Sequence, residues 1–100
     1  AVGGQWRREG FLPLAGFLGQ LLRVRAQMDF KESKWAEAEK RFREIVEKLP
    51  MSDAAPEALY WAGVSKYKAS NNPVALKETA KAFSTRYSDS SWAKKASIWA

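Results

Sequence analysis

Apolar residues recur along the chain with the period of an α-helix. From Trp35 to Leu49 they follow one another at intervals of three and four residues, with Glu, Lys and Arg between them. Such spacing places the apolar side chains on one face of a helix and the charged ones on the other. The same pattern returns in four further segments, so we expect five helices. They are predicted over residues 13–31, 34–49, 54–70, 73–87 and 90–99.

Turn-forming residues separate these segments. Pro13 suits the first turn of a helix, where its missing N–H has no partner to lose. Ser33 is the expected N-cap of the second helix, Pro50 ends that helix, and Asn72 with Pro73 begins the fourth. Because the connections are short, consecutive helices should run antiparallel. The sequence therefore predicts an all-α fold, and the only strand-like fragment is residues 1–8.

Charged residues fill the polar face of the second segment. Glu37 precedes Arg41 by four residues and Glu44 precedes Lys48 by four, an order that stabilises a helix through ion pairs. Carboxylates that alternate with basic residues in this way are typical of a solvated surface rather than of acid–base catalysis.

Comparison of the chain with itself reveals an internal repeat. A shift of 38 residues aligns five identical pairs, spaced as on one helical face, and it also places Ile45 opposite Phe83. The identical pairs are Ser52 and Ser90, Ala55 and Ala93, Ala58 and Ala96, Trp61 and Trp99, and Ala62 and Ala100. The repeated unit is thus a hairpin of two helices, and the last helix begins a third unit.

Several positions of this hairpin resemble the tetratricopeptide repeat. The matching residues are Ala38, Phe42, Ile45 and Pro50 in the second helix, and the run 58–63 with Tyr67 and Lys68 in the third. Gly63 would be the small residue at which two helices cross, and Ala26 its equivalent in the first helix. The chain departs from the family at Asp29, where an aromatic residue is preferred, at Ser88, which replaces a closing proline, and in its longer period. The resemblance implies helical hairpins stacked as a short right-handed superhelix.

In that family the first helix of each pair lines a concave, peptide-binding face. Carried over by position, this face holds Arg23, Gln27, Phe30, Lys31, Tyr60, Val64, Tyr67 and Lys68. Tyr60 and Val64 replace the lysine and asparagine with which some members clamp a terminal carboxylate, so an apolar groove with a basic rim is expected instead. The implied function is a scaffolding module whose partner is a protein or peptide, and the basic rim favours an acidic one.

A second resemblance concerns the N-terminal residues. The run 6–13 is similar to the end of a thioredoxin-like domain, with an edge strand and a glycine turn before a final helix. Residues 60–68 fit a pattern found in the helical tail of some bacterial thioredoxin-like proteins. Residues 1–12 are then a linker or the remnant of an upstream domain, and residues 13–100 are the helical domain. The alternative function is a structural accessory tail of a redox protein whose active site lies outside this chain.

Composition restricts the chemistry. The chain has neither cysteine nor histidine, which excludes thiolate nucleophiles, imidazole bases and Cys/His zinc sites. We therefore expect no enzyme activity, cofactor or metal. The net charge of +6 attracts acidic partners, but without a basic stripe interleaved with exposed aromatic residues, nucleic acid is not the expected partner. No apolar stretch approaches the roughly 20 residues of a membrane span, which favours a soluble, cytoplasmic protein.

The tryptophans of the helical segments are expected to pack between helices. Trp92, Ala96 and Trp99 should face the fourth helix, at Leu76, Ala80 and Phe83. Ile98 has no inward position in this arrangement. Its exposure would leave a small apolar patch, through which the C-terminal helix could form a homodimer.

Overall fold

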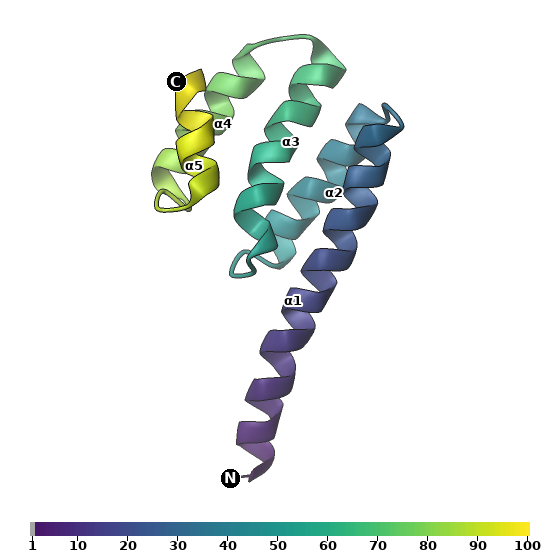
Figure 1. Cartoon of the computed structure of the whole chain (residues 1–100), viewed down its shortest axis with the longest axis vertical. Helices are drawn as coiled ribbons and strands as arrows, with labels where there is room; N and C mark the ends of the chain where they lie inside the picture. The colour runs from purple at the N-terminus through teal and green to yellow at the C-terminus, as the bar shows by residue number, and fades with distance from the viewer. Residues whose placement is uncertain (1) are drawn as a thin grey trace.

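Five α-helices and one short 3₁₀-helix form the molecule (Figure 1). This computed structural model describes the backbone of residues 2–100 and the side chains of residues 16–100. The elements are α1 (Val2–Lys31), α2 (Trp35–Lys48), α3 (Ala54–Ser70), α4 (Val74–Thr85), α5 (Ser91–Ala96) and the 3₁₀-helix η1 (Ser97–Trp99). Successive helices run antiparallel, and no strand occurs between residues 2 and 100. The all-α prediction is confirmed.

The first helix begins at Val2, eleven residues before the expected start. The expected edge strand over residues 1–8 is wrong, because the backbone is helical from Val2 onwards. A strand needs a neighbour to accept its hydrogen bonds, whereas a helix satisfies them within itself. Pro13 is compatible with helical φ and removes only its own donor. The assignment of residues 1–12 to a linker or upstream domain stays a prediction.

The other helix boundaries agree with the sequence to within about two residues, apart from the last helix, which finishes as η1. Two caps are confirmed by side-chain contacts: Asn72 Oδ1 accepts from the backbone N–H of Val74 at 3.0 Å, and Ser90 Oγ accepts from that of Ala93 at 3.1 Å. Ser33 is not the N-cap of α2. It adopts a left-handed conformation with φ 63° in the turn, and Lys34 takes the cap position without a side-chain hydrogen bond.

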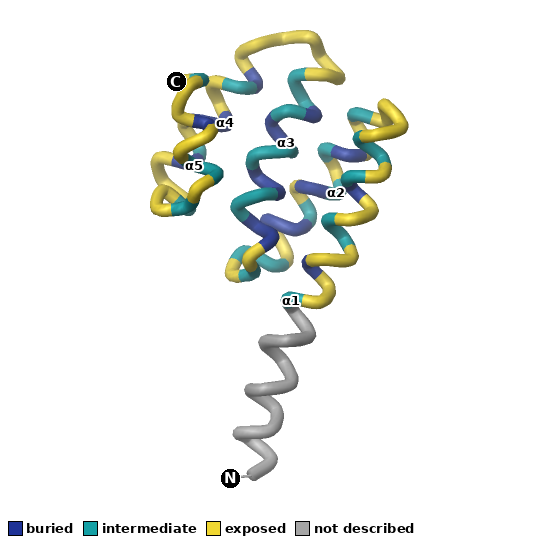
Figure 2. The backbone as a smooth tube through the Cα atoms, in the orientation of Figure 1, coloured by how far each residue is buried: buried dark blue, intermediate teal, exposed yellow. Residues whose placement is uncertain are grey.

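The core lies where α2 and α3 face each other and reach α1 and α4 (Figure 2). Phe42 and Ile45 of α2 are fully buried. Around them pack small residues, mostly alanines. These are Ala26, Ala38, Ala54, Ala58, Ala62 and Ala96. Small residues allow helix backbones to approach closely, so the core combines a few large side chains from α2 with closely packed neighbours.

Gly63 shows how close that approach is. A Cβ built on it would lie 2.7 Å from Thr79 Cβ and 2.8 Å from Thr79 Cγ2 of α4. Carbon atoms in contact normally stay about 3.5–4.0 Å apart. The prediction that a glycine at this position marks a helix crossing agrees with this geometry.

Burial repeats along the chain at a nearly constant interval. Three buried residues of α2 are each followed by a buried residue of α4 after 37 residues. The pairs are Ala38 and Ala75, Phe42 and Thr79, and Val46 and Phe83. Ala58 of α3 and Ala96 of α5 are buried 38 residues apart, as the self-comparison predicts. The pairing of Ile45 with Phe83 is therefore displaced by one residue, which the left-handed turn at Tyr87 absorbs.

The last helix packs differently from the expectation. Trp92 and Trp99 contact Tyr60 of α3, at centroid distances of 5.1 and 4.8 Å, rather than facing α4. Towards α4, the turn side of α5 presents Ala93 and Ser97 instead. Ile98 is 81% exposed, as predicted. Dimerisation through this residue stays a prediction.

Candidate binding face

Six half-buried aromatic rings form a continuous row across four helices. Each ring contacts at least one other, and we call the set the aromatic row. It consists of Phe30 from α1, Trp35 from α2, Tyr60 and Trp61 from α3, Trp92 from α5 and Trp99 from η1. Trp35 lies 4.8 Å from Phe30, and Phe30 lies 5.3 Å from Trp61, both edge-on. Edge-on and offset contacts at such distances are the favoured geometries of aromatic pairs.

The row continues from α3 to the C-terminal helix. Tyr60 and Trp61 lie edge-on at 5.3 Å, and Tyr60 stacks on Trp99 at 4.8 Å. Trp92 closes the group from the other side, 6.4 Å from Trp61. The four tryptophans do pack between helices, as predicted, but each keeps part of its ring at the surface. Rings of this kind offer apolar area that needs no rearrangement before a ligand binds.

A hollow of about 250 Å³ opens beside the row. It is lined by Gln27, Phe30, Lys31, Phe42 and Trp61. A dry apolar cavity of about 150 Å³ accommodates benzene, so this hollow can accept one large apolar side chain. Its lining is mainly hydrocarbon, with the Gln27 amide and the Lys31 ammonium as the polar groups. Such a combination of apolar walls and few polar groups is typical of binding sites.

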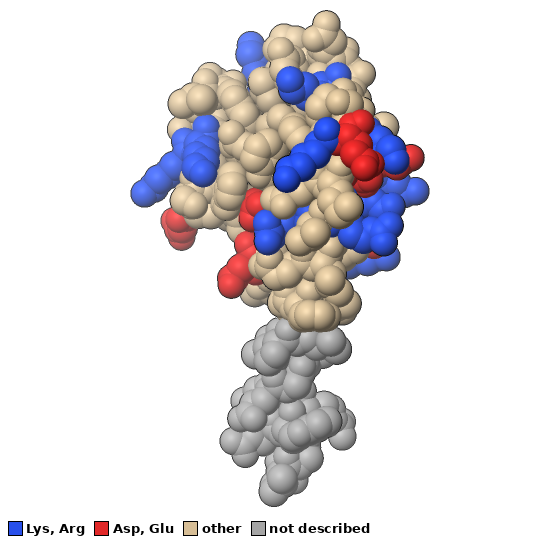
Figure 3. All heavy atoms as spheres, turned by 45° about the vertical axis from the view of Figure 1, so that its right-hand side comes forward, with Lys and Arg blue, Asp and Glu red and all other residues tan. Residues whose placement is uncertain are grey.

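Lysines lie beside both ends of the row. Lys68 Nζ lies 5.7 Å from the Trp35 ring centroid, and Lys95 Nζ lies 4.1 Å from that of Trp92, within cation–π range. Within residues 16–100 no carboxylate pairs with Lys31, Lys68 or Lys95. Figure 3 shows that basic side chains outnumber acidic ones on the side of the molecule it displays. The face therefore carries an unbalanced positive charge.

The carboxylate of Glu57 on this side of α3 is already neutralised. Arg23 Nη1 lies 3.5 Å from Glu57 Oε2, and Gln27 Nε2 donates to the same oxygen at 3.2 Å. Gln20 in turn accepts from Arg23 Nε at 2.8 Å. These contacts fix the relative position of α1 and α3 below the hollow, and they give Arg23 and Gln27 a positioning role.

The structure brings together most of the predicted face. Gln27, Phe30 and Lys31 line the hollow, Tyr60 belongs to the aromatic row, and Lys68 lies over Trp35. Arg23 contacts Glu57, as described above. Val64 and Tyr67 are half-buried on α3, and neither lines the hollow.

Sequence reasoning missed the tryptophans and Lys95 as parts of the face. The spacing of Trp61 and Trp99 in the internal repeat was the signal that could have found them. Two equivalent tryptophans on helices that both line the expected groove should both contribute to it. Assigning them to helix packing alone overlooked that a ring can pack on one edge and remain open on the other.

The described residues offer little for other chemistry. Within residues 16–100, no three acidic side chains gather in a way that could hold a metal ion. None of the described helices is long and apolar enough to cross a membrane.

Comparison of the chain with protein-family models, curated proteins and solved structures found no match. The functional argument therefore depends on the geometry of this face.

Proposed function

We propose that this chain is a protein–protein interaction module that binds a peptide segment on the aromatic row. The observation that carries the proposal is the aromatic row itself, which crosses four helices and has an apolar hollow beside it. Exposed tryptophan and tyrosine rings are the side chains that contribute most to binding energy in protein interfaces. The burial pattern that repeats every 37 or 38 residues supports a tetratricopeptide-like arrangement of the helices.

The chemistry of the partner follows from the charges. One bulky apolar side chain of the peptide fills the hollow next to Trp61, while carboxylates on either side approach Lys31 and Lys68. Since no carboxylate of the described residues pairs with these lysines, binding need not break an existing ion pair. Complementary charge raises the association rate and selects against basic peptides. The partner is thus an acidic segment with an aromatic or aliphatic anchor.

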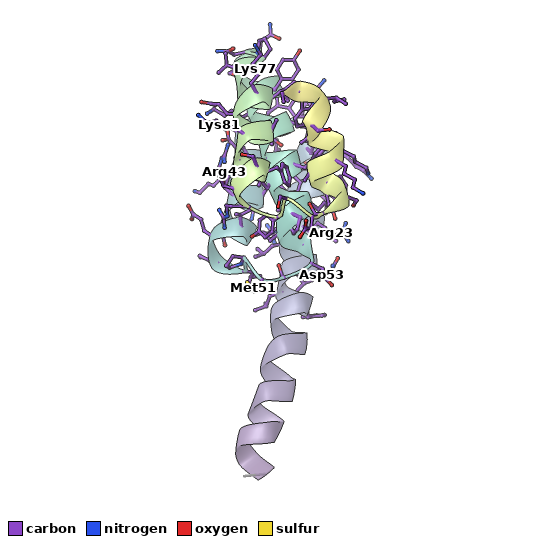
Figure 4. The ribbon with its side chains drawn as sticks, turned by 90° about the vertical axis from the view of Figure 1, so that its left-hand side faces the viewer. Arg23, Arg43, Met51, Asp53, Lys77 and Lys81 are labelled. Atoms are coloured by element: carbon purple, nitrogen blue, oxygen red, sulfur yellow. The ribbon has the colours of Figure 1, made fainter. Side chains whose placement is uncertain are left out.

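A labelled peptide tests this proposal directly. The probe is a short peptide with one Phe flanked by Asp and Glu, and its binding is followed by fluorescence anisotropy. Lys31→Glu together with Lys68→Glu should weaken binding by at least about tenfold, or 1.4 kcal/mol. Trp61→Ala should do the same by removing a wall of the hollow. Lys77→Glu, on the exposed side of α4, is the matched control and should leave the affinity unchanged (Figure 4).

Two results would overturn the proposal. One is equal binding of a control peptide in which Lys replaces every Asp and Glu, since the basic rim would then have no role. The other is tighter, salt-sensitive binding of a single-stranded oligonucleotide, which would indicate that the rings stack on bases instead.

A further inference from the structure

The outward side of α1 is the largest apolar surface that the described helices leave uncovered. Phe17 is 60% exposed, Leu21 48%, Val24 45% and Met28 57%. We call these four residues the outer stripe, and Leu18 lies next to it. Single exposed apolar residues are common, but a contiguous apolar stripe usually marks an interaction surface. Figure 2 shows exposed backbone along the side of α1 that faces away from the other helices.

The stripe lies opposite the side by which α1 joins its own bundle. Gly19 and Ala26 are buried against the other helices, and Gly19 approaches Ala54 and Ser52 of the chain that begins α3. Successive residues of an α-helix are about 100° apart, which places the outer stripe on the far side of α1 from Gly19 and Ala26. A helix that docks on the stripe therefore meets α1 without colliding with the rest of its bundle.

The repeating burial pattern indicates what belongs there. Ala26 of α1 corresponds to Gly63 of α3, 37 residues later, and both are buried. By the same interval, Leu21 corresponds to Ala58 and Met28 to Ser65, both of which are fully buried. On α3 this side is covered by neighbouring helices, whereas on α1 it is open. The position of a covering helix is thus vacant at the outer stripe.

We propose that the α1 helix of a second copy of this chain covers the outer stripe. The four residues are separated by intervals of four, three and four, and this sequence of intervals is the same in both directions. An antiparallel pair related by a two-fold axis therefore places an apolar residue opposite every apolar residue. Phe17 meets Met28 of the second copy, and Leu21 meets Val24 of the second copy. Such alternating intervals of four and three also define the seam of paired helices.

The residues beside the stripe are compatible with this pairing. In an antiparallel pair each side of the stripe meets the same side of the other copy. Leu18 then lies beside the aliphatic stem of Arg25 of the second copy, and Gln20 beside Gln27 of the second copy. The two Arg25 side chains are displaced along the helix by about five residues, or roughly 7.5 Å, in addition to the separation of the helices. No two like charges face each other directly.

The size and charge of the chain set the strength of association. The stripe extends over roughly 18 Å of helix, and its surface is smaller than the roughly 800 Å² per partner of a standard stable interface. Each chain also carries a net charge of +6, so that the two copies repel each other. We therefore expect a dimer with a dissociation constant of about 10–100 μM, strengthened by salt because salt screens the repulsion. This proposal is independent of the peptide-binding function, since the stripe and the hollow lie on different sides of α1.

Sedimentation equilibrium of the whole chain tests the dimer. At about 200 μM the weight-average mass should approach twice the 11.3 kDa of one chain, and Leu21→Glu with Val24→Glu should return it to one chain. Circular dichroism spectra that match the unsubstituted protein show that the variant is folded. Ile98→Glu is the matched control, because Ile98 is also exposed but lies on η1. A monomer at every concentration would overturn the proposal. So would a dimer that Ile98→Glu dissociates and the α1 variant does not.

Cross-linking tests the antiparallel register. The chain has no native cysteine, so that introduced thiols react without competition. A mixture of Phe17→Cys and Met28→Cys proteins should form a mixed disulfide dimer under mild oxidation. Either protein alone should not, because the identical positions of the two copies would be roughly 16 Å apart, beyond the Cα separation of a disulfide. A disulfide dimer of either single variant alone, or none in the mixture, would overturn the antiparallel arrangement.

Discussion

Helices α1 and α3 correspond to each other through the 37-residue interval, yet they are packed in opposite ways. On α3 the residues Ala54, Ala58 and Ala62 are small and buried. On α1, the corresponding Phe17 and Leu21 are large and exposed. Both helices show apolar residues at helical spacing, so periodicity alone does not distinguish them. Residue size does, because small residues permit contact between backbones whereas bulky ones hold a neighbour farther away.

This difference teaches where stability and interaction reside in the molecule. The closely packed helix α3 carries the core and holds Tyr60 and Trp61 at the centre of the aromatic row. The openly packed helix α1 contributes few buried residues among those described and exposes large ones. Substitutions at matching positions should therefore have unequal consequences, and the following comparisons measure the inequality.

The largest effect is expected at Phe42 of α2, which lies at the centre of the core with no exposed surface. Phe42→Ala removes most of a fully buried ring and leaves a cavity, which should lower the free energy of unfolding by about 3–5 kcal/mol. Urea denaturation followed by circular dichroism measures the change. The matched control is Phe17→Ala on α1, at a concentration where the chain is monomeric. It should change stability by only about 0.5 kcal/mol. Equal losses at the two positions would show that the outer side of α1 is packed as well.

A second comparison uses two glycines. Gly63→Ala should lower stability by about 1–3 kcal/mol, since the added methyl group overlaps Thr79 and forces α3 and α4 apart. Gly16→Ala should instead raise it by up to about 1 kcal/mol, because no atom lies within 4 Å of the new methyl group and alanine favours the helix. Thermal melts of both variants measure the difference.

The glycine comparison has an internal control. Thr79→Ala combined with Gly63→Ala removes the overlapping atoms and should recover part of the lost stability. If Gly63→Ala melts like the unsubstituted protein, the close contact between α3 and α4 does not exist.

Much of the fold could be predicted from the sequence, because its determinants are local. The apolar period gives the helices from residue 34 onwards, and the prolines and asparagines give their ends. The start of α1 could not be found in this way, since Pro13 has the same appearance at a first turn and within a longer helix. The ion pairs show the same limit. Glu44 and Lys48 pair as expected at 3.4 Å, but Arg41 turns from Glu37 to Asp29 of α1 at 2.7 Å.

The candidate face was predictable only in part. Position in the repeat identified Gln27, Phe30 and Lys31, which do line the hollow. It did not identify Trp92 or Trp99, because their contacts with Tyr60 depend on the angle at which α5 returns to α3. That angle is set by the turn at Tyr87, whose hydroxyl donates to the Pro50 carbonyl at 2.6 Å. A contact between residues 37 positions apart leaves no signal in the local pattern.

The smallest effect concerns the buried hydroxyl of Ser65 on α3. It is fully buried, and no atom of the described residues accepts or donates a hydrogen bond to Oγ. Burial of an unpaired hydroxyl is unfavourable, so Ser65→Ala should raise the free energy of unfolding by about 1 kcal/mol. Ser52→Ala is the matched control and should lower it by about 0.5–1 kcal/mol, because Ser52 Oγ donates to the Leu49 carbonyl at 2.7 Å. At the corresponding position of α1, Met28→Ala should be nearly neutral in the monomer, as expected for an exposed residue. Chemical denaturation of the three variants measures these differences. A loss of stability in Ser65→Ala would mean that the hydroxyl has a partner in solution, such as a bound water, and that α3 is less closely packed than its alanines indicate.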